Sequence, residues 1–251
     1  MMTEQEALAA ASKPLPLHGS DNTRDLGGYP TENGGKTAYR RLVRSDSLEE
    51  LTPADVEMLR EYGVGCCIDF RTADTCEKHP SALSRVDGID YYNLPIDDHI
   101  GNGDLEALTQ YQDMGDLYIE FLERNKQEFC TALQMILQHP NQVTLYHCTA
   151  GKDRTGILSM LLLKLAGVPE DRILADYQVT EHYMTSKFVR MKEVLEQCHQ
   201  KIPEYCFSSA PEQMKKAMAY LNMKYGNVER YIEAIGVSEG ECEKLKSVLK
   251  S

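Results

Sequence analysis

The segment that most constrains the fold runs from residue 143 to residue 168. It opens with an apolar run at residues 143–146 that suits a buried strand, and it continues through the loop letters HCTAGKDRTG. Residues 157–166 follow as an apolar helix that Gly167 ends. A strand joined to a helix by a short loop is the repeating unit of α/β proteins, so this segment indicates a parallel sheet flanked by helices.

The residues before this segment carry further signals of the same alternation. Thr52 is a helix cap, Pro53 is suited to the first helical position, and Gly63 ends the helix. The apolar run at residues 64–70 and the segment at residues 91–96 suit two more strands. Strands therefore alternate with helices, which supports the α/β assignment.

The other long segments are predicted to be helical or irregular. Residues 114–138 carry apolar side chains at helical spacing and predict one helix. Residues 169–251 contain repeated helix start and stop signals and predict a helical extension packed on the core. Residues 1–20 lack the basic start and apolar centre of a signal peptide and predict a mobile segment. We expect one domain over residues 1–251, with a central parallel-rich sheet and a helical C-terminal third.

Composition excludes several classes of function. The chain has 27 basic and 39 acidic residues, a net charge of -12, which argues against a nucleic-acid partner but permits a local anion pocket. The longest apolar stretch, residues 157–168, is far short of the ~20 residues that span a bilayer, so we expect no integral membrane segment and a soluble cytoplasmic protein. The eight cysteines show neither CxxC pairs nor zinc-type spacing, which predicts reduced thiols and no metal or other cofactor.

The loop between strand and helix contains the residues that carry chemistry. Small residues in such a loop turn backbone N–H groups inward as an anion cradle, and the helix adds the positive end of its dipole. Cys148 lies at the base of this cradle, where the field favours the nucleophilic thiolate. Arg154 offers a planar fork for two oxygens of one phosphoryl group. We expect His147 to fix the loop through hydrogen bonds and Thr155 to donate its hydroxyl to the sulfur.

The spacing of Cys148 and Arg154 resembles the Cys-x5-Arg signature of protein tyrosine phosphatases. More narrowly, the loop is similar to that of the bacterial tyrosine/dual-specificity branch, which reads HCxAGKDRTG. The segment NTRDLGGY from Asn22, the segment RSD from Arg44 and the segment IDFRT from Ile68 also resemble signatures of that branch. Its members act on phosphotyrosine, sometimes on phosphoserine or phosphothreonine, and often on phosphoinositides. The resemblance covers nearly the whole chain and implies the phosphatase fold.

The resemblance also implies roles for individual residues. Cys148 would form a phosphocysteine intermediate, and Arg154 would bind the substrate and the transition state. Lys152 would add positive charge at the rim of the site. Arg24 would brace the site or the N-terminal turn, or else take a direct part in binding the substrate and in catalysis. The phosphate-binding set implied by the loop contains His147, Thr149, Ala150, Gly151, Lys152, Thr155 and Gly156.

Two carboxylates compete as the general acid that protonates the leaving group. Asp153 lies inside the loop beside Arg154, and the bacterial branch carries an acid at the matching place. Asp98 follows a strand in the letters LPIDDH, which resemble the segment that bears a mobile acid in dual-specificity phosphatases. The shorter distance to the phosphate favours Asp153, and both assignments stay open.

The sequence leaves the substrate and the regulation open. We expect a phosphorylated protein or a phosphoinositide as substrate and inorganic phosphate as product. The alternatives are a catalytically weak adaptor that binds phosphorylated ligands, and a phosphatase of soluble inositol polyphosphates. A further hypothesis is that Cys66 or Cys67, on a strand near Cys148, could trap the oxidised catalytic cysteine as a disulfide.

Overall fold

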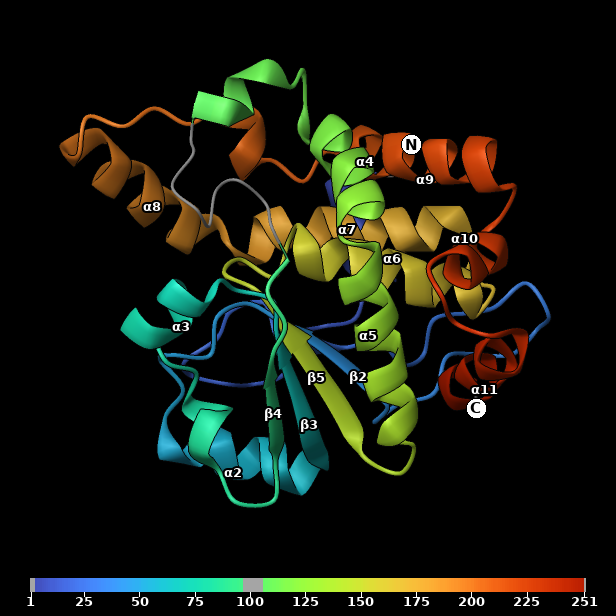
Figure 1. Cartoon of the computed structure of the whole chain (residues 1–251). Helices are drawn as coiled ribbons and strands as arrows, with labels where there is room; N and C mark the ends of the chain where they lie inside the picture. Colours follow the sequence, from blue (N-terminus) through green and yellow to red (C-terminus); the bar gives the residue numbers. More distant parts are fainter. Residues whose placement is uncertain (1–2, 97–105, 251) are drawn as a thin grey trace.

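The computed structural model describes residues 3–96 and 106–250, and five strands within these ranges form one sheet (Figure 1). The strand order is β1-β2-β5-β3-β4, and only the β1–β2 pair is antiparallel. The α/β class with a parallel-rich sheet is therefore confirmed. The strands are β1 (Arg24–Asp25), β2 (Leu42–Ser45), β3 (Val64–Asp69), β4 (Asp90–Asn93) and β5 (Val143–His147).

Helices cover the sheet and form most of the last third of the chain (Figure 1). The α-helices are α1 (Glu4–Ala10), α2 (Pro53–Tyr62), α3 (Ala73–Lys78), α4 (Met114–Arg124), α5 (Lys126–Gln138), α6 (Arg154–Leu165), α7 (Glu170–Tyr183), α8 (Thr185–Gln197), α9 (Pro211–Tyr225), α10 (Val228–Ala234) and α11 (Glu239–Leu249). The short 3-10 helices are η1 (Ala82–Arg85), η2 (Glu106–Gln110) and η3 (Glu204–Phe207).

The helix signals of the sequence are found where they were expected, with one exception. Thr52 caps α2 in a reciprocal capping box with Asp55, and Gly63 ends that helix at a φ of 100°. The prediction of a single helix over residues 114–138 is wrong, because Asn125 leaves helical geometry and separates α4 from α5. Asn favours such interruptions since its side chain competes with the backbone for hydrogen bonds.

The N-terminal residues differ from the expected mobile segment. Thr3 forms a reciprocal capping box with Glu6 at the start of α1. Ala7 is fully buried in a small apolar cluster with Ala175 and Val179 of α7. The small side chains allow the two helices to approach closely, so α1 is docked on the body of the protein.

The central strand β5 divides two apolar layers. Tyr146 lies in the larger core with the helices that follow, whereas its neighbour Leu145 lies in the smaller core against α2 and η1. Successive strand residues face opposite sides, so one strand supplies both layers. Helices α9, α10 and α11 join the larger core through Met214, Ile232 and Leu245. Within the described ranges, no helix combines the length and the apolar character that crossing a bilayer requires.

Candidate active site

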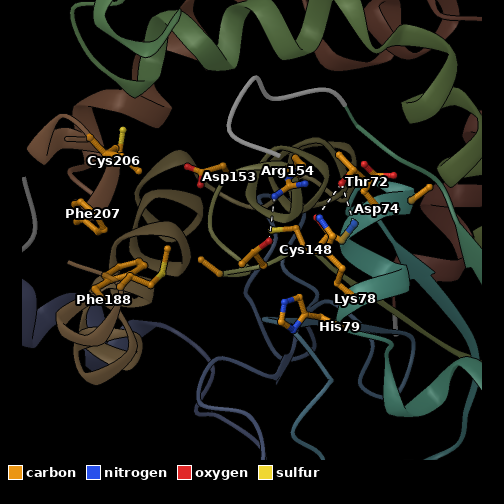
Figure 2. A pocket seen from close by; sticks show the side chains of 16 residues that line it. Thr72, Asp74, Lys78, His79, Cys148, Asp153, Arg154, Phe188, Cys206 and Phe207 are labelled. Carbon is orange, nitrogen blue, oxygen red and sulfur yellow. Dashed lines mark hydrogen bonds between the residues drawn. The ribbon is translucent and has the colours of Figure 1, made fainter. Parts of the chain in front are cut away.

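Residues between the end of β5 and the start of α6 form the floor of a cavity (Figure 2). Gly151 adopts a φ of 66°, and a Cβ at this position would lie 2.5 Å from the carbonyl oxygen of Ser45. Only glycine can therefore make this turn, because a side chain would be strained and would collide with β2. Helix α6 begins at Arg154, so its N-terminus adjoins the loop.

Three successive loop carbonyls are bonded to the scaffold. The carbonyl of Thr149 accepts from the backbone N–H of Ser47 at 3.0 Å, and that of Ala150 accepts from Nδ2 of Asn22 at 2.9 Å. The carbonyl of Gly151 accepts from Nη2 of Arg44 at 2.6 Å. In a trans peptide the following N–H points opposite to the carbonyl, so these bonds turn the loop N–H groups away from the scaffold.

A buried ion cluster holds Arg44 in place. The carboxylate of Asp176 on α7 forms an ion pair with Arg44. Its Oδ1 atom also lies 2.9 Å from Nε of Arg24 and accepts a hydrogen bond from the hydroxyl of Tyr29 at 3.0 Å. Burial by itself would raise the pKa of Asp176. The guanidinium groups of Arg24 and Arg44 outweigh this effect and lower the pKa to about 2. Arg24 is thus buried in this cluster and is not among the residues that line the cavity; it contacts Asp176, which also holds Arg44.

The cavity has a volume of about 790 Å³ and two chemically different walls. One wall is polar and comes from α3, including Lys78 and His79 at its C-terminal end (Figure 2). The other wall is apolar and comes from α8 and the segment around η3. The residues of the apolar wall are Phe188, Met191, Ile202, Cys206 and Phe207. Sequence reasoning missed both walls, because neither carries a motif and both are brought to the loop only by the fold.

Cys148 and Arg154 both line the base of this cavity. Cys148 is almost fully buried, and Arg154 is fixed by bonds from its guanidinium to the carbonyl of Phe70 at 3.1 Å and to Oγ1 of Thr149 at 3.4 Å. The sequence-predicted nucleophile and the predicted phosphate-binding arginine are therefore brought together in one site. A planar guanidinium held at a helix N-terminus is suited to a phosphoryl group.

His147 supports the loop from behind and does not line the cavity. Its Nδ1 lies 3.2 Å from the carbonyl oxygen of Cys148, and its Nε2 lies 3.3 Å from Oδ2 of Asp69. Burial lowers the pKa of His147 although Asp69 opposes this effect, so the ring is largely uncharged at neutral pH. The expected hydrogen bond to the loop is present, and it is made to the backbone.

Two expectations for the loop are wrong. Lys152 does not reach the rim: it is buried, and its ammonium donates to the carbonyls of Cys206 and of Ser208, the latter at 3.0 Å. These two hydrogen bonds hold the loop against the segment around η3. Thr155 is also buried, and within the described residues its hydroxyl forms no hydrogen bond to the sulfur or to any other group. Gly156 lies in the first turn of α6 and outside the cavity.

Of the two candidate acids, the structure describes one. Asp153 lines the cavity, and its Oδ1 is hydrogen-bonded to the hydroxyl of Tyr118 at 2.6 Å. Its Oδ1 also lies 3.4 Å from the ammonium of Lys152. Asp98 lies outside the described residues. The contact with Tyr118 joins positions 35 residues apart, and the sequence offers no signal for it.

The strand register excludes the proposed disulfide with Cys148. Cys66 lies opposite Thr144 and Cys67 opposite Leu145, whereas the catalytic loop begins beyond the end of β5. Cys148 is therefore displaced by three to four residues, roughly 10–13 Å along the strand, and a disulfide requires Cα atoms within about 7 Å. Among the described residues, no group of three His, Cys, Asp or Glu side chains is arranged to hold a metal ion.

Comparison with known proteins identifies the family. A family model described as "Tyrosine phosphatase family" matches residues 15–251. A tyrosine-protein phosphatase of Nostoc commune is 34% identical over 219 residues, which is 82% of this chain and 72% of the relative. The triple specificity protein phosphatase PtpB of Mycobacterium tuberculosis is 25% identical over 279 residues, with 93% of this chain and 98% of the relative covered.

Among solved structures, P. aeruginosa TpbA is 16% identical, with a TM-score of 0.39 over 78% of this chain and 86% of that one. The overall structural similarity between the two chains is therefore low. The family match, by contrast, extends over almost the whole chain and includes the loop from His147 to Gly156. The chain therefore belongs to the tyrosine phosphatase family and is a protein-tyrosine phosphatase.

Proposed function

We propose that this phosphatase works through a phosphocysteine intermediate on Cys148. The observation that supports this most directly is the meeting of Cys148, Asp153 and Arg154 in one cavity at the N-terminus of α6. In the first step the thiolate attacks phosphorus, the S–P bond forms and the P–O bond to the leaving group breaks. Asp153 gives its proton to the leaving oxygen, and Arg154 with the loop N–H groups binds the phosphoryl oxygens.

In the second step water releases the phosphate. The Asp153 carboxylate accepts a proton from the attacking water, a new P–O bond forms and the S–P bond breaks. The products are inorganic phosphate and the thiolate of Cys148, which is the starting form of the enzyme. The same carboxyl group thus acts first as acid and then as base, as reversibility of the chemistry demands.

For the substrate, we propose a phosphotyrosine-bearing protein. The apolar wall at Phe188 and Phe207 offers a surface on which an aromatic ring can pack. A phosphoinositide is the second candidate, because Lys78 and His79 on the opposite wall could bind another phosphate. Lys152 gives no support to this second candidate, since its ammonium is bonded to main-chain carbonyls.

A substrate panel tests this proposal. We expect the largest kcat/KM for a phosphotyrosine peptide, with lower values for a phosphoserine peptide, mono- and bisphosphorylated inositol lipids and inositol hexakisphosphate. Phosphate release would be followed with EDTA present. A larger kcat/KM for the bisphosphorylated lipid would favour the second candidate. Tight binding of these ligands without a product burst or steady turnover would favour a phospho-binding adaptor instead.

The general acid is tested by the variant Asp153→Asn. With an unactivated aryl phosphate, which needs a protonated leaving group, we expect kcat to fall by about 10²-fold or more and the fall in rate at high pH to disappear. An activated nitrophenyl ester should be affected much less. The matched variant is Asp98→Asn. Loss of the alkaline limb in Asp98→Asn, with the limb retained in Asp153→Asn, would transfer the role to Asp98.

A further inference from the structure

Phe207 of the apolar wall is packed against helix α8 (Figure 2). Its ring meets that of Phe188 edge to face, with the ring centroids 5.9 Å apart, and Nζ of Lys192 lies 4.8 Å from its centroid. Both phenylalanines line the cavity. Aromatic rings attract one another only over a narrow range of separations and tilts. The exact position of Phe207 therefore decides how well the ring of a substrate can pack on this wall.

The main chain on either side of Phe207 is bonded to the loop. The ammonium of Lys152 donates to the carbonyl oxygens of Cys206 and Ser208, the residues immediately before and after Phe207. An ammonium has three protons, and two of them are used in these bonds. Oδ1 of Asp153 also lies 3.4 Å from Nζ. Lys152 is buried and is not among the residues that line the cavity, so it acts on the cavity through the main chain of the wall.

A carboxylate of helix α7 holds the same stretch of chain. Oε2 of Glu181 accepts from the backbone N–H of Ser209 at 2.7 Å and from Oγ of Ser208 at 3.2 Å. Glu181 is exposed and is not among the residues that line the cavity. A cation and an anion thus hold one segment. Removing either one loosens this segment, but the two removals change the charge near the cavity in opposite directions.

We propose that Lys152 is a positioning residue that sets the preference of the enzyme for aromatic phosphate esters, because it fixes the main chain on both sides of Phe207. This inference rests on the proposed function, in which the ring of a phosphotyrosine packs on Phe188 and Phe207. A wall that is loose before binding loses conformational freedom when a ring packs on it, and this cost lowers the affinity. A wall already fixed by Lys152 avoids that cost. The role concerns the ring of the substrate and not its phosphate.

A role of Lys152 through its charge alone leads to different expectations. A positive charge near the cavity attracts the phosphate of every ester, so its loss would weaken phosphotyrosine, phosphoserine and inorganic phosphate by similar factors. Loss of the negative charge of Glu181 would have the opposite sign. Positioning, by contrast, predicts that loss of either side chain weakens the binding of phosphotyrosine selectively.

The test measures binding in the Cys148→Ser background, so that changes at Asp153, the neighbour of Lys152, do not enter through kcat. Calorimetric titration gives the Kd of a phosphotyrosine peptide, of the same peptide with phosphoserine, and of inorganic phosphate. The readout is the preference, defined as the Kd of the phosphoserine peptide divided by that of the phosphotyrosine peptide. We expect Lys152→Met and Glu181→Ala each to lower the preference by about 5–10-fold. Inorganic phosphate should bind within about threefold of the background value.

The reference for a missing ring is Phe207→Ala. Alone it should lower the preference by a similar factor, and adding Lys152→Met to it should lower the preference no further, because Lys152 acts through Phe207. The control for loss of a hydrogen-bonded ammonium is Lys224→Met. Nζ of Lys224 donates to Glu123 at 2.7 Å, and neither residue lines the cavity, so the preference should keep its background value.

The outcomes separate this inference from the proposed function. If Phe207→Ala lowers the preference but Lys152→Met and Glu181→Ala do not, the positioning role is refuted and the packing of the substrate ring on the apolar wall stands. Equal weakening of all three ligands by Lys152→Met, without an effect of Glu181→Ala, also refutes it. Should Lys152→Met not fold, the exposed substitution Glu181→Ala decides alone. If Phe207→Ala itself keeps the preference, the proposed ring packing fails.

Discussion

Replacing Cys148 with serine is expected to lower kcat by at least about 10⁴-fold for every substrate, including an activated nitrophenyl ester. The substitution changes one atom at the base of the cavity and leaves the loop, Arg154 and the ion cluster intact. A serine hydroxyl stays protonated in this field and is a much weaker nucleophile than a thiolate. Phosphate release under saturating substrate measures the effect.

Binding should survive this substitution, because the donors for the phosphoryl group remain. We expect the Kd of Cys148→Ser for a phosphotyrosine peptide to lie within about threefold of the wild-type KM. The matched control is Cys198→Ser, which changes an exposed free cysteine outside the cavity and should keep the wild-type kcat. If Cys148→Ser retains more than one per cent of kcat, the phosphocysteine mechanism is excluded.

The largest expected effect on stability comes from Asp176→Asn. This change removes the negative charge between Arg24 and Arg44, whose side chains are both buried. Leaving two guanidinium groups uncompensated in the interior should lower the free energy of unfolding by about 3–5 kcal/mol. Urea denaturation followed by circular dichroism measures it. The control is Asp171→Asn, at an exposed position of the same helix, with an expected loss below about 1 kcal/mol.

The sign of the pH dependence follows from the lowered pKa of Asp176. An unfolded aspartate titrates near ~3.9, whereas the folded group titrates at about 2. Its stabilisation is therefore fully present above the unfolded pKa and is lost as the pH falls through the folded pKa. The difference between wild type and Asp176→Asn should be largest above pH ~5 and should shrink towards pH ~2. A difference that stays constant down to pH ~2 would mean that the charge is not what stabilises the cluster.

The parts of the site that could be predicted are those that lie together in the sequence. Cys148, Arg154 and Asp153 are within seven residues of one another, and a strand followed by a helix fixes their geometry locally. The same holds for the capped start of α2 and for Gly63 at its end. Local backbone chemistry decides these features, so sequence spacing was sufficient.

The parts that could not be predicted depend on distant contacts. In the sequence, Lys152 looks like a solvent-exposed loop lysine. In the folded protein, its ammonium donates hydrogen bonds to the carbonyl oxygens of Cys206 and Ser208, which lie more than 50 residues away in the sequence. The walls formed by α3 and α8 carry no motif. The N-terminal helix α1 is too short to be stable alone, and it forms against small side chains of α7 that sequence spacing does not reveal.

The distribution of the loop's hydrogen-bond partners along the chain has a consequence for protein synthesis. Asn22 and Arg44 leave the ribosome before the loop does, but Asp176, which fixes Arg44, follows it, and Ser208, which binds Lys152, emerges later still. A nascent chain folds from its N-terminal end as translation proceeds. The unfinished polypeptide can thus expose the catalytic thiol without its fixed surroundings. We therefore expect chains that end before Ser208 to lack phosphatase activity.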